Sequence, residues 1–157
     1  SIKVLNGNLY RNIEWPVVVM LAAMIPVGQA LETSGISLSI ANFISTSTAG
    51  MDLPWLILMI LVITMFVSDI VNNAATAVIM APIAANLAIQ VGQPVEPFLM
   101  AVAVGASCAF LSPIGHQCNT LVMAPGNYKF GDYWRLGLPL ECVIVAISIP
   151  MILFVWT

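Results

Sequence analysis

Long apolar stretches separated by short polar segments run through most of the chain. Residues 15–31 carry no charge, and as a helix they would reach about 26 Å, near the lower limit for crossing a bilayer. Another apolar stretch closes the chain. The pattern predicts membrane-spanning helices over 15–32 and 138–157, with a polar segment over 1–14 before the first.

A shorter and more polar segment follows the first predicted span. Ile36, Ile40, Phe43 and Ile44 recur at helical spacing, with serine and asparagine between them. A short helix with one apolar and one polar face suits the surface of a membrane. We therefore expect an interfacial arm helix over 35–47.

Two apolar legs then flank the polar segment 68–76. Each leg would reach about 24–27 Å as a helix, which is close to the thickness of the hydrocarbon core. Two interpretations fit this pattern. Residues 53–91 form either a pair of full spans or a re-entrant hairpin that enters and leaves on one side of the membrane.

The next apolar segment, 97–125, is interrupted over 112–119 by a proline, a glycine and several polar residues. Such an interruption inside an apolar element predicts a broken membrane helix. Residues 126–137 follow as a polar loop. Its aromatic residues Tyr128, Tyr133 and Trp134 are typical of a membrane–water interface.

Composition excludes several classes of protein. Of the 157 residues, 61% are hydrophobic and 7% are charged, whereas a soluble domain has about 25% charged residues. So few charges exclude a water-soluble monomer and a disordered chain. Four basic residues make no patch that would neutralise nucleic-acid phosphates. The chain is therefore predicted to be an all-α integral membrane protein in contact with the lipid bilayer.

Sidedness follows from the basic residues, which are Lys3, Arg11, Lys129 and Arg135. Both interpretations of 53–91 leave an even number of crossings between the segments 1–14 and 126–137. Because basic residues favour the cytoplasmic side, both segments are predicted to be cytoplasmic. The chain is then a multi-pass protein of the cell membrane, and its hairpin opens to the outside.

The first polar interruption has the chemistry of an ion site. If the chain unwinds at Asn72 and Asn73, carbonyl groups ending the first leg can hold a cation, and N–H groups starting the second can face an anion. The alternative is an exposed turn, which asparagine favours. Asp69 is the only acid between Asp52 and Glu96. It would balance a cation, carry a proton, bind backbone N–H groups at the tip, or cap the second leg.

The second interruption offers similar groups. Carbonyl oxygens freed near Ile114 and Gly115 are hard, neutral ligands that suit sodium. The side chains of Asn119 and Thr120 can contact a bound solute. His116 is either a structural residue or a proton carrier. Cys118 lies near His116 in sequence but lacks the context of an activated nucleophile, so no enzyme is predicted.

Two motifs resemble one known family. The segment Val71-Asn72-Asn73-Ala74-Ala75-Thr76-Ala77 is similar to the Ser-Asn-Thr hairpin tip of the divalent anion–sodium symporter (DASS) family. The segment from Ser107 to Asn119 is similar to that family's broken helix, and the order of elements matches over nearly the whole chain. The resemblance implies an elevator-type transporter of sulfate or carboxylates, usually with sodium, built from two inverted repeats.

This chain would then be the end of the second repeat and would supply half of the site. Asn73 matches the central Asn of the motif, which contacts both sodium and substrate, and Asn119 matches the Asn that follows a Thr-Pro-Pro run. The implied sodium ligands are Ser68, Val71, Asn73 and Gly115. The expected substrate contacts are Asn72, Asn73, Thr76, Asn119 and Thr120.

Two departures from the family pattern affect the expected substrate. Ala74 lacks the hydroxyl of the motif's threonine, and His116-Gln117-Cys118 replaces Thr-Pro-Pro. These changes favour an inorganic oxyanion such as sulfate over a dicarboxylate.

The resulting hypothesis is secondary transport of a small divalent anion with Na⁺ and without an organic cofactor. Its partners would be the first repeat of the same polypeptide and, as a homodimer, a second copy. The alternatives are a proton-linked antiporter that uses Asp69 and His116, and a membrane subunit that does not transport.

Overall fold

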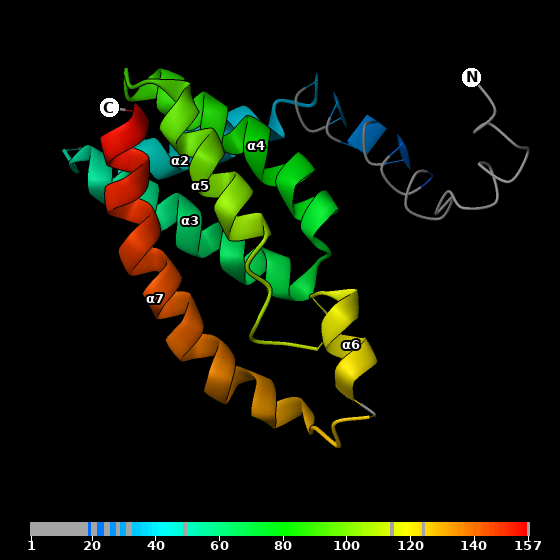
Figure 1. Cartoon of the computed structure of the whole chain (residues 1–157). Coiled ribbons are helices and arrows are strands. Elements are labelled where there is room, and N and C mark those ends of the chain that lie inside the picture. Colours follow the sequence, from blue (N-terminus) through cyan, green and yellow to red (C-terminus); the bar gives the residue numbers. More distant parts are fainter. Residues whose placement is uncertain are drawn as a thin grey trace, which may run out of the picture.

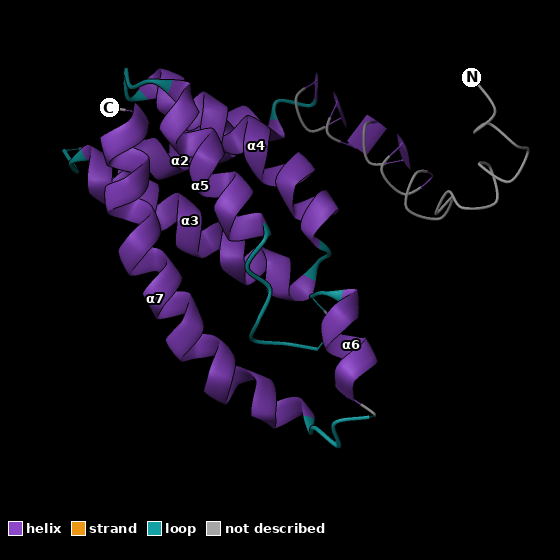
Figure 2. Cartoon of the chain, viewed as in Figure 1, coloured by secondary structure: helices purple, strands orange, loops and turns teal. Residues whose placement is uncertain are grey.

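The computed structural model of the protein describes residues 19, 22–23, 26–27, 29–30, 33–48, 50–113, 115–123 and 125–156. Every element in these ranges is a helix, and the described part of the chain contains no strand (Figures 1 and 2). The all-helical class is thereby confirmed for these residues. The segments expected over 1–14 and 15–32 lie entirely or mostly outside them.

Helices α3, α4 and α7 are long and apolar enough to cross a membrane. Helices α2 and α5 are shorter but apolar, and α6 has seven residues. The bounds are α2 Ile36–Ser47, α3 Leu53–Ile70, α4 Asn73–Gln90, α5 Val95–Ala106, α6 Gln117–Met123 and α7 Phe130–Trp156.

Helices α3 and α4 form a hairpin whose turn is shorter than the predicted 68–76. Only Val71 and Asn72 lie between the two helices. The turn is short because the Asn72 side chain caps α4: its Oδ1 accepts a hydrogen bond from the Ala75 amide at 2.9 Å. Ser68 and Asp69 consequently remain helical, and both are buried.

Helix α5 packs against both legs of this hairpin, and most of the core lies between these three helices. Phe98, Ala101 and Val102 form the buried face of α5. Close approach to α3 depends on Gly105, since a Cβ there would lie 2.8 Å from the Thr64 Cβ and 2.9 Å from the Leu61 carbonyl oxygen.

The break after α5 starts earlier than predicted. We expected helix up to residue 111, but α5 ends at Ala106 and α6 begins at Gln117. The Cys108 amide bonds the Gly105 carbonyl in a tight turn. The Leu111 amide bonds the Asp69 side chain instead of continuing the helix. We call residues 107–116 the break segment.

Helix α7 also begins earlier than predicted, because 130–137 is helical and not part of a loop. The Asp132 side chain accepts a hydrogen bond from the Lys129 amide at 2.8 Å, which is half of a capping box at the helix start. From there α7 runs back past α5 and α3 (Figure 1). Gly137 and Ile152 are buried, while most of its other apolar side chains are exposed or half-buried, as suits a lipid surrounding.

Candidate functional site

The end of α3, the start of α4 and the break segment meet at one place (Figure 1). The Ser68 hydroxyl oxygen lies 2.8 Å from the Ala106 carbonyl oxygen and 3.0 Å from Asn73 Oδ1. Its single proton is donated to one of them at a time. Ser68 is fully buried. One hydroxyl thus joins the last residue of α5 to both legs of the hairpin.

Asp69 binds the break segment through its side chain and its backbone. Its Oδ1 accepts from the Leu111 amide at 3.0 Å, and its carbonyl oxygen accepts from the Ser112 hydroxyl at 2.6 Å. Its Oδ2 is buried and has no hydrogen-bond partner among the described residues. The capping role considered for Asp69 belongs instead to Asn72. Asp69 therefore shapes irregular backbone that is distant in sequence.

Gly115 packs directly against the end of α3. A Cβ at this position would lie 2.8 Å from the Ser68 carbonyl oxygen and 3.1 Å from the Asp69 Cα. Of the four expected sodium ligands, Ser68, Asn73 and Gly115 are thus neighbours, and Val71 lies in the turn between α3 and α4. Hydroxyl, amide and backbone oxygens gather here, and such oxygens suit a hard cation.

The expected anion-binding residues of α4 have different surroundings. Asn73 is half-buried and uses its Oδ1 toward Ser68, so its side-chain nitrogen remains the group that can donate to a ligand. Asn72 is exposed and its Oδ1 caps α4. Thr76 is fully buried, one turn into the helix. The structure therefore joins Asn73, but not Thr76, to the exposed end of the hairpin.

Asn119, at the start of α6, holds the break segment in shape. Its side-chain nitrogen donates to the Ala109 carbonyl oxygen at 2.8 Å and to the Ser112 carbonyl oxygen at 3.1 Å. Its own carbonyl oxygen accepts from the Tyr133 hydroxyl at 2.7 Å. Both side-chain amide protons are in use, so Asn119 can donate to an anion only by giving up one of these bonds.

The remaining residues of this region have separate partners. His116 is half-buried, and its Nδ1 accepts from the Cys118 amide at 3.2 Å. This bond requires an unprotonated Nδ1 and involves the backbone of Cys118, not its thiol. The expected contact from the side chain of Thr120 lies outside the described part of the chain.

Sequence reasoning missed three residues of this region. Ser112 and Tyr133 bond backbone atoms that are distant in sequence, and no local pattern indicates such bonds. Glu141 was detectable, because it is the only acid in the apolar segment 138–156. Its Oε1 is buried and has no hydrogen-bond partner among the described residues.

Comparison with protein families gives two overlapping matches to the citrate transporter family, over residues 3–105 and 53–157. The chain belongs to the citrate transporter family. This family consists of membrane transporters and not of enzymes, and the three long apolar helices are those of a membrane protein.

Individual relatives of the chain are also named as transporters. An uncharacterized transporter of Synechocystis is 38% identical over 93% of this chain and 24% of its own length. A probable sodium/sulfate cotransporter of Chlamydomonas reinhardtii is 34% identical, over 88% of this chain and 16% of its own. A sodium-dependent high-affinity dicarboxylate transporter of Caenorhabditis elegans is 30% identical, over 85% and 24%. The resemblance to divalent anion–sodium symporters is thereby confirmed. The chain spans a quarter or less of the length of these relatives.

Proposed function

We propose that this chain supplies half of a site that transports a divalent anion together with sodium. The observation that carries the proposal is the position of the Ser68 hydroxyl, which contacts both Asn73 and the last carbonyl of α5. A polar connection of this kind, buried between apolar helices, needs a reason beyond stability. Relatives named as sodium/sulfate and sodium-dependent dicarboxylate transporters support the same function.

In this proposal, sodium binds among Ser68, Val71, Asn73 and Gly115. The Ser68 carbonyl lies in the last turn of α3, next to Gly115. Sodium would be coordinated by such backbone oxygens and would bind between Asn73 and Ala106, which the Ser68 hydroxyl joins. The charge of sodium also lowers the cost of bringing a dianion into the membrane.

The anion binds beside sodium at the start of α4. Asn72 already bonds the Ala75 amide through its side chain and the Thr76 amide through its backbone. The Asn73 and Ala74 amides, which have no partner within the helix, remain available together with the Asn73 side-chain nitrogen. Asn72, Asn119 and Thr120 complete the proposed anion contacts, with Asn119 acting mainly through the shape of the break segment, whereas Thr76 is fully buried and lies one turn away in α4.

Coupling follows because Asn73 belongs to both parts of the site. Sodium fixes its Oδ1 and thereby orients its nitrogen toward the anion, so each ligand raises the affinity for the other. Ala74 offers no hydroxyl to a carboxylate, which favours a sulfate-like oxyanion. A dicarboxylate is the second candidate substrate, because one relative is named as a dicarboxylate transporter.

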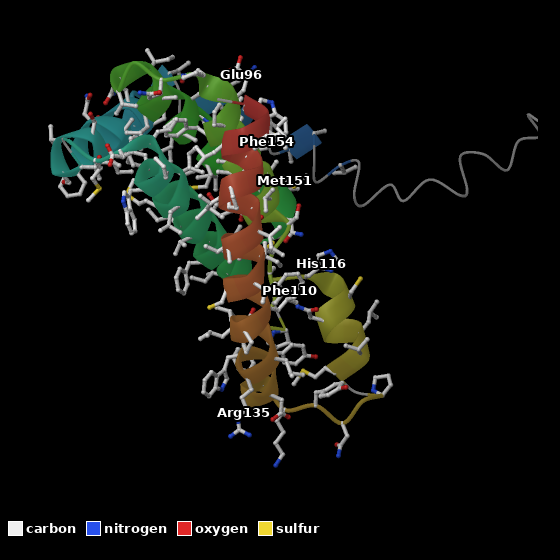
Figure 3. The ribbon with its side chains drawn as sticks, turned by 60° about the vertical axis from the view of Figure 1, so that its left-hand side comes forward. Glu96, Phe110, His116, Arg135, Met151 and Phe154 are labelled. Atoms are coloured by element: carbon white, nitrogen blue, oxygen red, sulfur yellow. The ribbon has the colours of Figure 1, made fainter. Side chains whose placement is uncertain are left out.

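The arrangement of the helices supports a site inside the membrane. Figure 3 shows Glu96 and Arg135 near opposite ends of the helical body, with Phe110 and His116 between them. We propose that residues 126–137 face the cytoplasm. We also propose that 53–91, which follows the arm helix α2 in the chain, is a re-entrant hairpin open to the outside. The other inverted repeat would complete the elevator-type site, in a homodimer.

The test is uptake of labelled sulfate and of succinate by proteoliposomes containing the full-length protein, with and without an inward sodium gradient. The variant Asn73→Ala should abolish sodium-stimulated uptake and remain folded. Asn86→Ala is the matched control, because Asn86 lies in the same helix but bonds the Ser37 hydroxyl oxygen, 3.3 Å away, far from the hairpin turn. Normal sodium-stimulated uptake by Asn73→Ala would refute the proposal.

A further inference from the structure

Helix α7 holds the break segment at Phe110. A Cβ on Gly137 would collide with the Phe110 carbonyl group, so the two backbones touch. Glu141 lies one turn further along the same face of α7. Its side chain lines the same cavity as that of Leu111, the residue after Phe110. Helix α7 thus brings an acid close to the break segment.

The next residue is held from the opposite helix. The Leu111 amide donates to Asp69 Oδ1, from α3, at 3.0 Å. Acids from two different helices, α3 and α7, therefore lie at this part of the break segment. Each has an oxygen, Asp69 Oδ2 or Glu141 Oε1, that is buried and lacks a partner among the described residues.

The described helices around these acids offer little to balance two negative charges. Both acids adjoin Leu111, because Asp69 bonds its amide and Glu141 lines the same cavity. Helices α3, α4 and α5 contain no lysine, arginine or histidine. The basic residue of α7, Arg135, lies near the end of the body that is opposite Glu96 (Figure 3). His116, in the break segment, bonds the Cys118 amide.

Glu141, unlike Asp69, borders a cavity. It lines a cavity of about 400 Å³ between α3 and α7 whose other lining residues include Met65, Phe66, Leu111 and Val145. This cavity is bounded almost entirely by apolar side chains. A charged carboxylate oxygen without a donor is costly in such surroundings, and a second acid nearby adds to the cost.

We propose that Glu141 is a proton-binding site of this protein. A proton on the carboxyl group makes the side chain neutral and removes the cost of an unpartnered charged oxygen beside the apolar cavity. Loss of this proton places a second charge near the break segment and disfavours the packing of α7 on it. Residues 107–116 thereby become sensitive to pH.

The proton site is tested by infrared difference spectra of the purified full-length protein as the pH is raised. The carbonyl band of a neutral carboxylic acid should disappear with rising pH in the unsubstituted protein. The same loss is expected in the control Glu96→Gln, whose acid is exposed at the start of α5. The band should be absent in Glu141→Gln and shifted in frequency in Glu141→Asp, which keeps a carboxyl group if the glutamine variant does not fold. An unchanged band in both Glu141 variants would overturn the proposal.

A link to transport rests additionally on the proposed function, and the pH dependence of anion uptake tests it. Uptake by the unsubstituted protein and by Glu96→Gln should fall at alkaline pH, whereas uptake by Glu141→Gln should lose this fall. If the infrared band is lost while the two pH profiles coincide, the proton site stands and its link to transport is refuted. If no form takes up sulfate or succinate, the proposed function fails and the infrared result still decides the proton site.

Discussion

Asp69 Oδ1 and the Leu111 amide nitrogen lie 3.0 Å apart although 42 positions separate the two residues in sequence. Together with the bond from the Ser112 hydroxyl to the Asp69 carbonyl oxygen, this contact makes the last turn of α3 the template on which the break segment is arranged. The hairpin and the broken helix therefore form one structural unit, and substitutions at the end of α3 should act on both.

Removing the Asp69 carboxyl group should destabilise this unit. Asp69→Ala leaves the part-buried Leu111 amide without an acceptor, at a cost of about 1–3 kcal/mol. The melting temperature of the purified protein should fall accordingly. Asp69→Asn keeps an acceptor oxygen, so its melting temperature should fall less. Asp52→Ala is the control, because Asp52 is exposed and its side chain makes no capping bond. Equal melting temperatures for Asp69→Ala and Asp52→Ala would contradict this prediction.

Substitution of Ser68 should weaken sodium binding more than stability. Ser68→Ala removes the hydroxyl that connects Asn73 to Ala106. Loss of one such oxygen ligand should raise the sodium concentration for half-maximal uptake about tenfold, equivalent to about 1.4 kcal/mol. Ser39→Ala serves as the control, since the exposed Ser39 hydroxyl makes a local bond to the carbonyl oxygen of Gly35, just before α2. An unchanged sodium dependence in Ser68→Ala would exclude Ser68 as a ligand.

A methyl group at Gly115 should separate the break segment from α3. The added carbon would lie 2.8 Å from both the Ser68 carbonyl oxygen and the Ala109 Cβ. Overpacking of this kind costs about 1–3 kcal/mol. Gly115→Ala should therefore lower sodium-stimulated uptake strongly. Gly131→Ala provides the comparison, because no atom would lie within 4 Å of its Cβ. Similar uptake rates for the two variants would show that Gly115 is not needed for close packing.

The Tyr133 hydroxyl should stabilise the start of α6. Tyr133→Phe removes its bond to the Asn119 carbonyl oxygen, with an expected loss of about 1 kcal/mol in the free energy of unfolding. Uptake should decline because Asn119 loses one restraint. Tyr128→Phe makes the same chemical change at an exposed ring. Equal free energies of unfolding for the two variants, measured by calorimetry, would argue against this role for Tyr133.

The apolar legs of the hairpin and the existence of two interruptions were predictable, because charge-free stretches and polar residues such as Asn72 and Asn119 mark them. The residues at which these helices and interruptions begin and end were not predictable. Helix α5 stops at Ala106 because the residues that follow bond to α3, as the Leu111 amide does to Asp69. The local sequence pattern does not indicate these long-range bonds. Helix α7 begins at Phe130 through a capping bond from Lys129 to Asp132, whose spacing could have been recognised.

The same long-range contacts decided which site residues could be foreseen. Ser68, Asn73 and Gly115 were named from their motif and do lie together. The use of both Asn119 amide protons inside the break segment depends on the backbone path between Ala109 and Ser112, which no periodicity specifies.

The bond from the Leu111 amide to Asp69 has a consequence for hydrogen exchange. Amides in irregular backbone usually exchange quickly, because they are solvated or break open locally. Here the Leu111 amide is bonded to an acid of α3. Its exchange therefore requires that α3 separates from the break segment. Its protection should be as long-lived as that of amides within the helices, and the slowly exchanging part of this protein should include a residue that belongs to no helix.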